Sequence, residues 1–210
     1  MQIEIYKVDD IEKKAETRKL YEECFDEGKD EFIDYYYSDI IKRNEMVVVK
    51  EDNEVVSMIH LNPYSYDVFG KKHKVHYLVA IATREKCRRK GLMKKVLQKA
   101  VEYLKEKKEP FCYLVPENEE LIKLYSKYGF SVVCNFTLDK FKRDSYDIHP
   151  DYNPEYIDLM KKEQYFLDME SEEYKLSLRD KKVMFRLLSN DFELSIDKLK
   201  EASIYVCQEV

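Results

Sequence analysis

The chain has 210 residues and a mass of 25.4 kDa, enough for one large domain or one domain with an appendage. Hydrophobic residues make up 44% and the net charge is -5, which allows a core and argues against general binding to nucleic acid or anionic membranes. Five scattered cysteines without a CxxC pair suit free thiols and no metal site. The N-terminus lacks an apolar signal segment and no run is long enough to span a membrane, so we expect a soluble, cytoplasmic protein.

The first part of the chain predicts one strand, two helices and then a set of strands. Apolar residues alternate in the strands and recur at helical spacing in the helices. The EDNE segment reads as the turn of a hairpin. The expected strands cover 3–8, 46–50, 55–61 and 73–83, and the expected helices cover 10–26 and 30–43.

The most informative stretch runs from Tyr77 to Leu104, where an apolar strand meets a basic turn containing Gly91 and then an amphipathic helix over 91–107. A helix that begins after such a turn presents unpaired N–H groups and the positive end of its dipole. That arrangement suits a phosphate or pyrophosphate. An ordinary strand–helix connection with a solvated surface fits the same letters. Because the chain is acidic overall, the local basicity of residues 84–95 favours a small anionic ligand.

The later elements carry clear end signals. Pro110 precedes a short apolar strand over 111–115 that suits a buried parallel position. Asn118 is suited to cap the next helix and Gly129 to end it. One or two strands follow over 130–141, then a connector over 149–154, a helix over 155–170, a strand over 183–188 and a helix over 195–207. We expect a main domain of residues 1–145 and a small α/β appendage of residues 146–210, whose role the sequence does not indicate.

Two motifs together resemble the Gcn5-related N-acetyltransferases (GNAT). IATREKCRRKGLM resembles their acyl-CoA-binding motif, Q/R-x-x-G-x-G/A, with Arg88 and Gly91 in place and Met93 where Gly or Ala is usual. The R-R-x-G-L turn is similar to that of the enhanced-intracellular-survival acetyltransferases, whose N-terminal domain we expect to be the nearest relative. Downstream, NEELIKLYSKYGF resembles a second GNAT motif, matched by Asn118, Tyr125, Gly129 and Phe130.

The resemblance covers residues 1–145 and implies a fold. That fold is α/β (α+β): a mixed, mostly antiparallel twisted sheet with central splayed parallel strands and flanking helices. The C-terminal appendage is added to it.

The resemblance also implies how acetyl-CoA is held, without a metal. The backbone of residues 88–93 would cradle the pyrophosphate, and the strand before the turn would pair with pantetheine through its main chain. A backbone N–H near Val79 to Ile81 would stabilise the developing oxyanion. Asn118 would bond CoA or only cap its helix. The expected cofactor-binding residues are Ile81, Ala82, Thr83, Arg88, Arg89, Lys90, Gly91, Leu92, Met93 and Asn118.

Tyr125 is the catalytic residue that the resemblance implies. Its phenol, with a free pKa of about 10, would return a proton to the leaving thiolate, whose free pKa is about 8.5. A structural role is the alternative, because the chain has 18 tyrosines. The general base stays open between a water chain and several side chains, namely His60, His76, Glu23, Glu31 and Asp34.

The expected function is an N-acetyltransferase that moves an acetyl group from acetyl-CoA directly to a primary amine of a small molecule or an exposed, peptidyl amino group. A non-catalytic CoA-binding sensor or interaction module is the alternative, followed by transfer to a hydroxyl or of a longer acyl chain. The segment 30–39 is acidic and aromatic and would suit a cationic amine, or it only packs on the sheet. We expect no nucleic-acid or membrane partner, and a monomer or homodimer.

Overall fold

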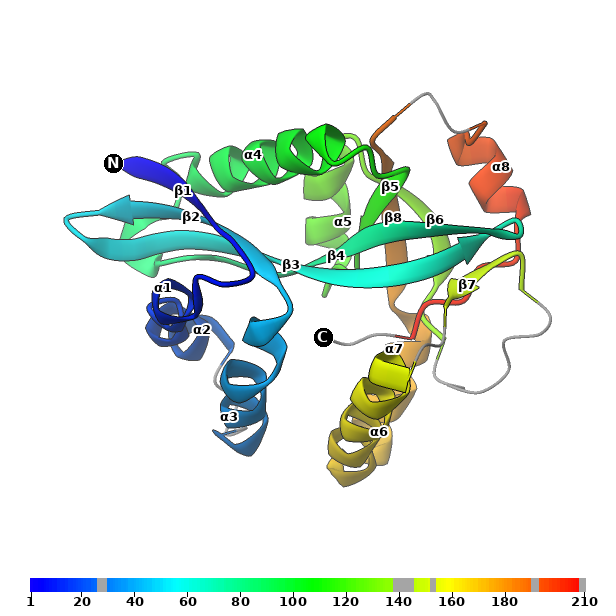
Figure 1. Ribbon diagram of the computed structural model, residues 1–210, viewed down its shortest axis with the longest axis horizontal. Helices are drawn as coiled ribbons and strands as arrows, with labels where there is room; N and C mark the ends of the chain where they lie inside the picture. Colours follow the sequence, from blue (N-terminus) through cyan, green and yellow to red (C-terminus); the bar gives the residue numbers. More distant parts are fainter. Residues whose placement is uncertain (26–29, 138–145, 152–153, 190–192, 208–210) are drawn as a thin grey trace. The chain divides into compact units, whose positions relative to one another are not determined.

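The chain folds into two compact units, which are described in turn (Figure 1). The structure is a computed structural model that describes residues 1–25, 30–137, 146–151, 154–189 and 193–207. Unit 1 consists of Met1–Pro63 and Leu78–Lys107, and unit 2 of Tyr64–Tyr77 and Lys108–Val210. Two long strands, β3 (Glu54–Val68) and β4 (Lys71–Thr83), each contribute one segment to each unit.

Unit 1 is a sheet with helices on both faces (Figure 1). Its strands follow the order β1-β2-β3-β4, with β1 (Gln2–Tyr6) and β2 (Glu45–Glu51) antiparallel and β2 antiparallel to β3. One face carries α4 (Leu92–Glu106), and the other carries the N-terminal helices α1 (Ile11–Ala15), α2 (Arg18–Phe25) and α3 (Asp30–Ser38). Short 3-10 turns cover Ile40–Lys42 (η1) and Glu85–Cys87 (η2).

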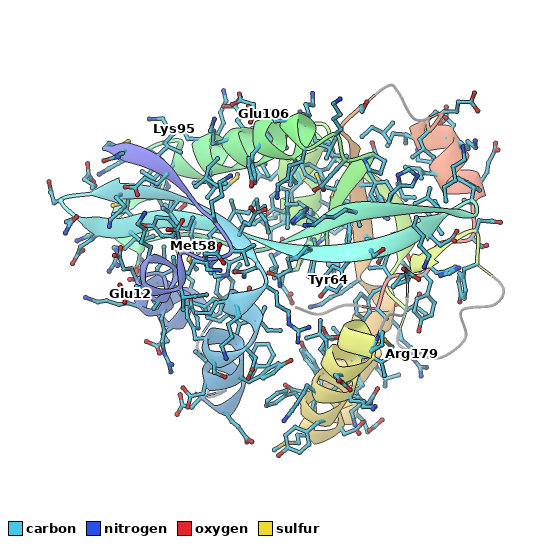
Figure 2. All side chains as sticks on the ribbon, viewed as in Figure 1. Glu12, Met58, Tyr64, Lys95, Glu106 and Arg179 are labelled. Atoms are coloured by element: carbon cyan, nitrogen blue, oxygen red, sulfur yellow. The ribbon has the colours of Figure 1, made fainter. Side chains whose placement is uncertain are left out.

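Helix α4 shows why the sequence pattern predicted this arrangement. Leu92, Val96 and Ala100 recur at steps of four and are buried against the strands. Lys95 and Glu106 lie on the opposite face and point away from the sheet (Figure 2). The predicted helix over 91–107 is therefore confirmed to within one residue at each end.

The predicted helix over 10–26 is divided into α1 and α2, and this part of the prediction is wrong. Its interruption falls at Thr17, whose hydroxyl donates to the carbonyl of Lys14 at 2.6 Å. Lys14 is buried, and its ammonium donates to the carbonyls of Val8 and Asn44 at 2.8 and 2.9 Å. Side chains that bond to nearby backbone groups compete with regular helix, which explains the break.

Unit 2 continues the sheet order as β3-β4-β5-β8-β6, with β7 beside β3. β4 and β5 pair in parallel, whereas β8 is antiparallel to both β5 and β6. The strands are β5 (Phe111–Leu114), β6 (Ser131–Asn135), β7 (Ile148–Pro150) and β8 (Lys182–Leu187). The helices are α5 (Glu119–Ser126), α6 (Pro154–Met169), α7 (Glu172–Asp180) and α8 (Ile196–Glu201).

The fold class is confirmed: a mixed α/β architecture with a mostly antiparallel sheet, a parallel pair and flanking helices. The strand β8, which we predicted as part of the appendage, lies between β5 and β6 in this sheet. β7 and α7 were not predicted, although Ser171 accepts the N–H of Tyr174 and marks the start of α7. The far end of the strand predicted over 130–141 lies outside the described residues. No helix in the described part of the chain is long and apolar enough to cross a membrane.

Candidate functional site

The end of β4 has an irregular backbone that the sequence did not predict. Ala80 has a φ of +50°, in the left-handed region that non-glycine residues seldom adopt. A strand residue in this conformation turns its peptide groups out of the regular ladder. The irregularity falls within the segment Val79 to Ile81, where we expected an N–H directed at a thioester carbonyl.

The following residues of β4 are anchored on the side of β3. The Ser57 hydroxyl donates to the Ala82 carbonyl at 2.9 Å and lies 2.8 Å from the Thr83 hydroxyl oxygen. On its other side, β4 forms a parallel ladder with β5 at His76 and Tyr77, and within the described residues no later pair extends it. The backbone of 78–83 is thus held on one edge and available to an extended ligand on the other.

The basic turn, residues 84–91, leads from β4 into α4. Gly91 is the N-cap, with a φ of +74°, and an added Cβ there would meet no atom within 4 Å. The glycine is therefore required by its backbone conformation and not by crowding. The first helical bond runs from the Lys95 N–H to the Gly91 carbonyl, at 3.2 Å. Within the described residues, the N–H groups of 89–93 have no acceptor, so they form an open donor set for an anion.

The charged side chains of the basic turn divide into fixed and exposed ones. Arg84 pairs with Glu23 at 3.0 Å, and the same carboxylate accepts the Glu85 N–H at 3.3 Å. A cavity of about 490 Å³ lies at this point, lined by Glu23, Arg84, Glu85 and Lys86. Arg88, Arg89 and Lys90 are exposed. Arg88 uses one donor on the Thr83 carbonyl, at 3.1 Å, and is also hydrogen-bonded to the Cys24 side chain, so part of its guanidinium is left for a ligand.

The two residues after Gly91 are less exposed than Arg88, Arg89 and Lys90 and offer less of their side chains to a ligand. The side chain of Leu92 is 2% exposed and belongs to the core, so only its N–H is available to a ligand. Met93 is half-buried at the position where the motif usually has Gly or Ala. Its side chain covers part of the surface that a smaller residue would leave open.

In unit 2, the predicted ends of α5 are confirmed. The Asn118 side chain accepts the Leu121 N–H at 3.0 Å and caps the helix. Gly129 has a φ of +80°, and the Phe130 N–H returns to the Tyr125 carbonyl at 3.3 Å. The cap is one of the two roles that we considered for Asn118, and it uses the amide oxygen; in the described part of the chain the amide nitrogen has no acceptor.

Tyr125 lies on the buried face of α5, 6% exposed. Its ring is 6.2 Å from that of Phe130, in an edge-on arrangement. Burial raises the pKa of Tyr125 to about 12, which keeps the phenol protonated at neutral pH. Within the described residues burial is the only cause of this shift, and no hydrogen bond to the hydroxyl contributes to it. The phenol therefore keeps its proton, and it is a weaker acid than we assumed from its free pKa.

The candidate bases are mostly engaged. Asp34 pairs with Arg18 at 2.6 Å, Glu23 binds the basic turn, and Glu31 is exposed. In unit 2, His76 is buried against Glu109, with its Nδ1 2.8 Å from the carboxylate. His60 is also buried, and its burial together with the charge of Lys14 lowers its pKa to about 3. Among the described residues, no group of three or more side chains is arranged to bind a metal ion.

The predicted site residues fall into two sets. Unit 1 brings together the end of β4 and the basic turn with its helix, that is, Ile81, Ala82, Thr83, Arg88, Arg89, Lys90, Gly91, Leu92 and Met93. Unit 2 contains Asn118 and Tyr125 on one helix. The sequence indicated the segment Val79 to Ile81, but not the irregular conformation of Ala80 or the anchor at Ser57, because neither residue type signals them.

A family model described as the acetyltransferase (GNAT) domain matches residues 7–133. This match confirms the family resemblance and the enzyme class that we drew from the two motifs. No curated protein matches the chain by sequence.

Solved structures show a similar fold at low identity. A conserved Enterococcus faecalis protein of unknown function is 15% identical, with a TM-score of 0.54 over 63% of this chain and 32% of its own length. The present chain thus spans about a third of that protein. The ribosomal-protein-S18-alanine N-acetyltransferase of Escherichia coli is 12% identical, with a TM-score of 0.55 over 92% of this chain and 97% of its own. The NatC complex bound to Gag peptide and CoA contains a chain that is 14% identical, with a TM-score of 0.53 over 90% and 100%.

Proposed function

Because the chain belongs to the acetyltransferase (GNAT) domain family, and with it to the acyl-CoA-dependent acetyltransferases, we propose that it transfers an acetyl group from acetyl-CoA directly to a primary amine. The acceptor is a small molecule or an exposed amino group. One observation carries the proposal: the N–H groups of 89–93 stand open at the start of α4, directly after a strand whose backbone is irregular at Ala80.

The residues present fit the donor substrate. The open N–H groups and the helix dipole suit a pyrophosphate, and the exposed Arg88, Arg89 and Lys90 add positive charge around it. The main chain of Ile81 to Thr83 is suited to pair with pantetheine. Asn118 is a further candidate contact through its amide nitrogen.

The chain's own groups account for the two charges that the transfer creates. A backbone N–H at Val79 to Ile81 would stabilise the negative charge on the acetyl oxygen. Tyr125 would donate its proton to the departing sulfur. Because the pKa of Tyr125 is about 12, against about 8.5 for a free thiol, this proton transfer is favourable only if the site stabilises the phenolate that it leaves.

The proposal also includes the subfamily, the kind of acceptor and the domain boundary. The R-R-x-G-L turn supports a relationship with the enhanced-intracellular-survival acetyltransferases. The names of two similar structures refer to a ribosomal protein and a peptide, which is why exposed amino groups are included among the acceptors. The end of the family match at residue 133 supports residues 1–145 as the acetyltransferase domain, although β8 of the later segment pairs within the sheet. Expression of residues 1–145 alone tests this division.

The donor step is tested by calorimetry with acetyl-CoA and the transfer step by thiol release with a panel of primary amines. We expect acetyl-CoA to bind and at least one amine to be acetylated. Absence of acetyl-CoA binding at millimolar concentration would overturn the proposal. Binding without turnover of any amine would favour the CoA-binding sensor or module instead.

A further inference from the structure

Four polar side chains of unit 1 are buried together on the face of the sheet that carries α2 and α3. We call them the Tyr36–His60 cluster, and they are Tyr36, Asn44, His60 and Asn62. None is more than 3% exposed. Tyr36 comes from α3, Asn44 precedes β2, and the other two belong to β3. So much buried polarity is unusual unless every group finds a partner.

The hydrogen bonds inside the cluster leave part of it unsatisfied. The Tyr36 hydroxyl lies 2.9 Å from His60 Nδ1, and Asn44 Nδ2 donates to Asn62 Oδ1 at 3.0 Å. Within the described residues, His60 Nε2, Asn62 Nδ2 and Asn44 Oδ1 are buried without a partner. Since Tyr36 has one proton and its shortest contact is to Nδ1, we assign that proton to this bond and the ring proton to Nε2. The cluster then offers two hydrogen-bond donors and one acceptor to a bound molecule.

The electrostatics of the cluster select against a charged ligand. His60 is neutral, because its burial and the nearby Lys14 ammonium both oppose a second positive charge. Lys14 donates to the Asn44 carbonyl at 2.9 Å, so a fixed cation borders the cluster. Within the described residues no carboxylate bonds to any of the four side chains. An uncharged hydrogen-bonding group therefore fits better than an ammonium or, given the buried site, a carboxylate.

Aromatic rings connect the cluster to the surface. The Tyr21 ring lies 5.1 Å from Tyr36 and 6.0 Å from His60. Phe25 lies 5.0 Å from Tyr21 and is 38% exposed, and the half-buried Phe32 lies 6.3 Å from Tyr36. An apolar or aromatic body would therefore lie along these rings with its polar end at the cluster, once the outer rings shift to admit it.

The cluster also lies beside the irregular segment of β4. β3 and β4 form a hairpin about Gly70, so they run antiparallel. Ser57 of β3 contacts Ala82 and Thr83 of β4. Three residues further along β3, His60 is opposite the Val79–Ala80 segment, where the proposed function requires the acetyl group to react.

We propose that the Tyr36–His60 cluster recognises the acceptor and selects primary amines that carry an aromatic or apolar body with an uncharged hydrogen-bonding group. This inference rests on the proposed amine acetylation and names its substrate class. Hydroxylated or amide-bearing arylalkylamines would be preferred over those with a carboxylate or a second ammonium. The buried polar groups and the aromatic rings, and not the exposed carboxylates of 30–39, then select the body of the acceptor.

The test compares kcat/KM for tyramine, phenethylamine and 4-(2-aminoethyl)benzoate in the wild type and in Asn62→Ala. Asn135→Ala, an exposed asparagine of β6, is the matched control. We expect the wild type and the control to prefer tyramine over the other two by about tenfold or more, because a buried polar site rejects an analogue that leaves it unpaired. Asn62→Ala should reduce this ratio to near one. A merely structural defect would lower all three values together and keep the ratio.

Two results would overturn the inference while leaving the proposed function intact: equal use of the three amines by the wild type, or an unchanged preference in Asn62→Ala. Either would mean that the cluster only holds buried water or packs the core. If no amine is acetylated although acetyl-CoA binds, the proposed function itself fails. Should Asn62→Ala not fold, Asn44→Ala removes the acceptor of the same set, and the wild-type ratio remains decisive without any variant.

Discussion

The basic turn and the buried polar side chains present their chemistry in opposite ways. The basic turn offers backbone N–H groups at an exposed helix start, and its Arg88, Arg89 and Lys90 side chains stand in solvent. Tyr125 and His60 present single side-chain atoms that the core surrounds. A backbone site tolerates side-chain changes such as Met93, because every residue type except proline supplies the same N–H. A buried side chain has no such substitute, so changes there should have the larger effects.

The largest effect is expected for Tyr125→Phe. Removal of the proton donor should lower kcat by about 10²–10⁴-fold, the range typical of general acid catalysis. The Kd for acetyl-CoA should stay within about twofold, because the ring still packs against Phe130. Thiol release measures kcat and calorimetry measures the Kd.

Tyr128→Phe is the matched control for this change, since Tyr128 is half-buried at the end of the same helix. It should keep near-wild-type kcat. If Tyr125→Phe also keeps kcat, then Tyr125 is structural and the thiolate takes its proton from water.

The second effect concerns pH and His60. Its folded pKa of about 3 lies below the unfolded value of about 6.5, so the unfolded chain binds more protons between these values. Stability therefore falls as the pH drops through this window, by about 2–3 kcal/mol at a pH of about 4.5. His60→Gln lacks this titration and should lose correspondingly less.

Urea denaturation at neutral pH and at a pH of about 4.5 measures this difference. His149→Gln, at a half-buried histidine of unit 2, is the control and should keep the wild-type pH dependence. Equal losses in the wild type and His60→Gln would contradict a neutral, buried His60.

Much of the fold was predicted from local signals. These predictions were correct where a residue type has one strong conformational preference. Gly91 and Gly129 both adopt a positive φ, and Asn118 caps its helix as its side chain allows. Ala80 adopts a positive φ as well, but alanine does not signal one. Its conformation must be imposed by the neighbouring strands, which the local sequence does not reveal.

The other features that the sequence did not predict also depend on residues far apart in the chain. β8 pairs between β5 and β6, and nothing in its own six residues specifies that place. His60 was recognisable as a candidate, but its environment depends on Tyr36 and Asn44, which come from other elements. The sequence thus indicated single candidate residues but not the partners that surround them.

Gly91→Ala tests whether the backbone N–H groups of the basic turn bind acetyl-CoA. Alanine at a φ of +74° costs about 1–2 kcal/mol, and relaxation of the turn would misplace the open N–H groups. Acetyl-CoA binding should weaken by about tenfold, measured by calorimetry. Gly70→Ala is a close control, because Gly70 has a φ of +80° and equally open surroundings in the β3–β4 hairpin. It should cost similar stability and leave the Kd unchanged; an equal change in both variants would remove the basic turn from the binding site.

The smallest effect is expected for Lys90→Gln. A small effect is what we expect if the turn binds its ligand through backbone N–H groups and not through side chains. Lys90 is exposed, and a single solvated charge contributes about 0.5–1 kcal/mol, so acetyl-CoA should bind about two- to fivefold more weakly. The difference should shrink between about 20 mM and about 300 mM salt, because screening removes it. Lys19→Gln, an exposed lysine on α2, should have no effect. A loss as large as that of Gly91→Ala would mean that the turn binds through its side chains, and the contrast between backbone and side-chain chemistry would no longer hold.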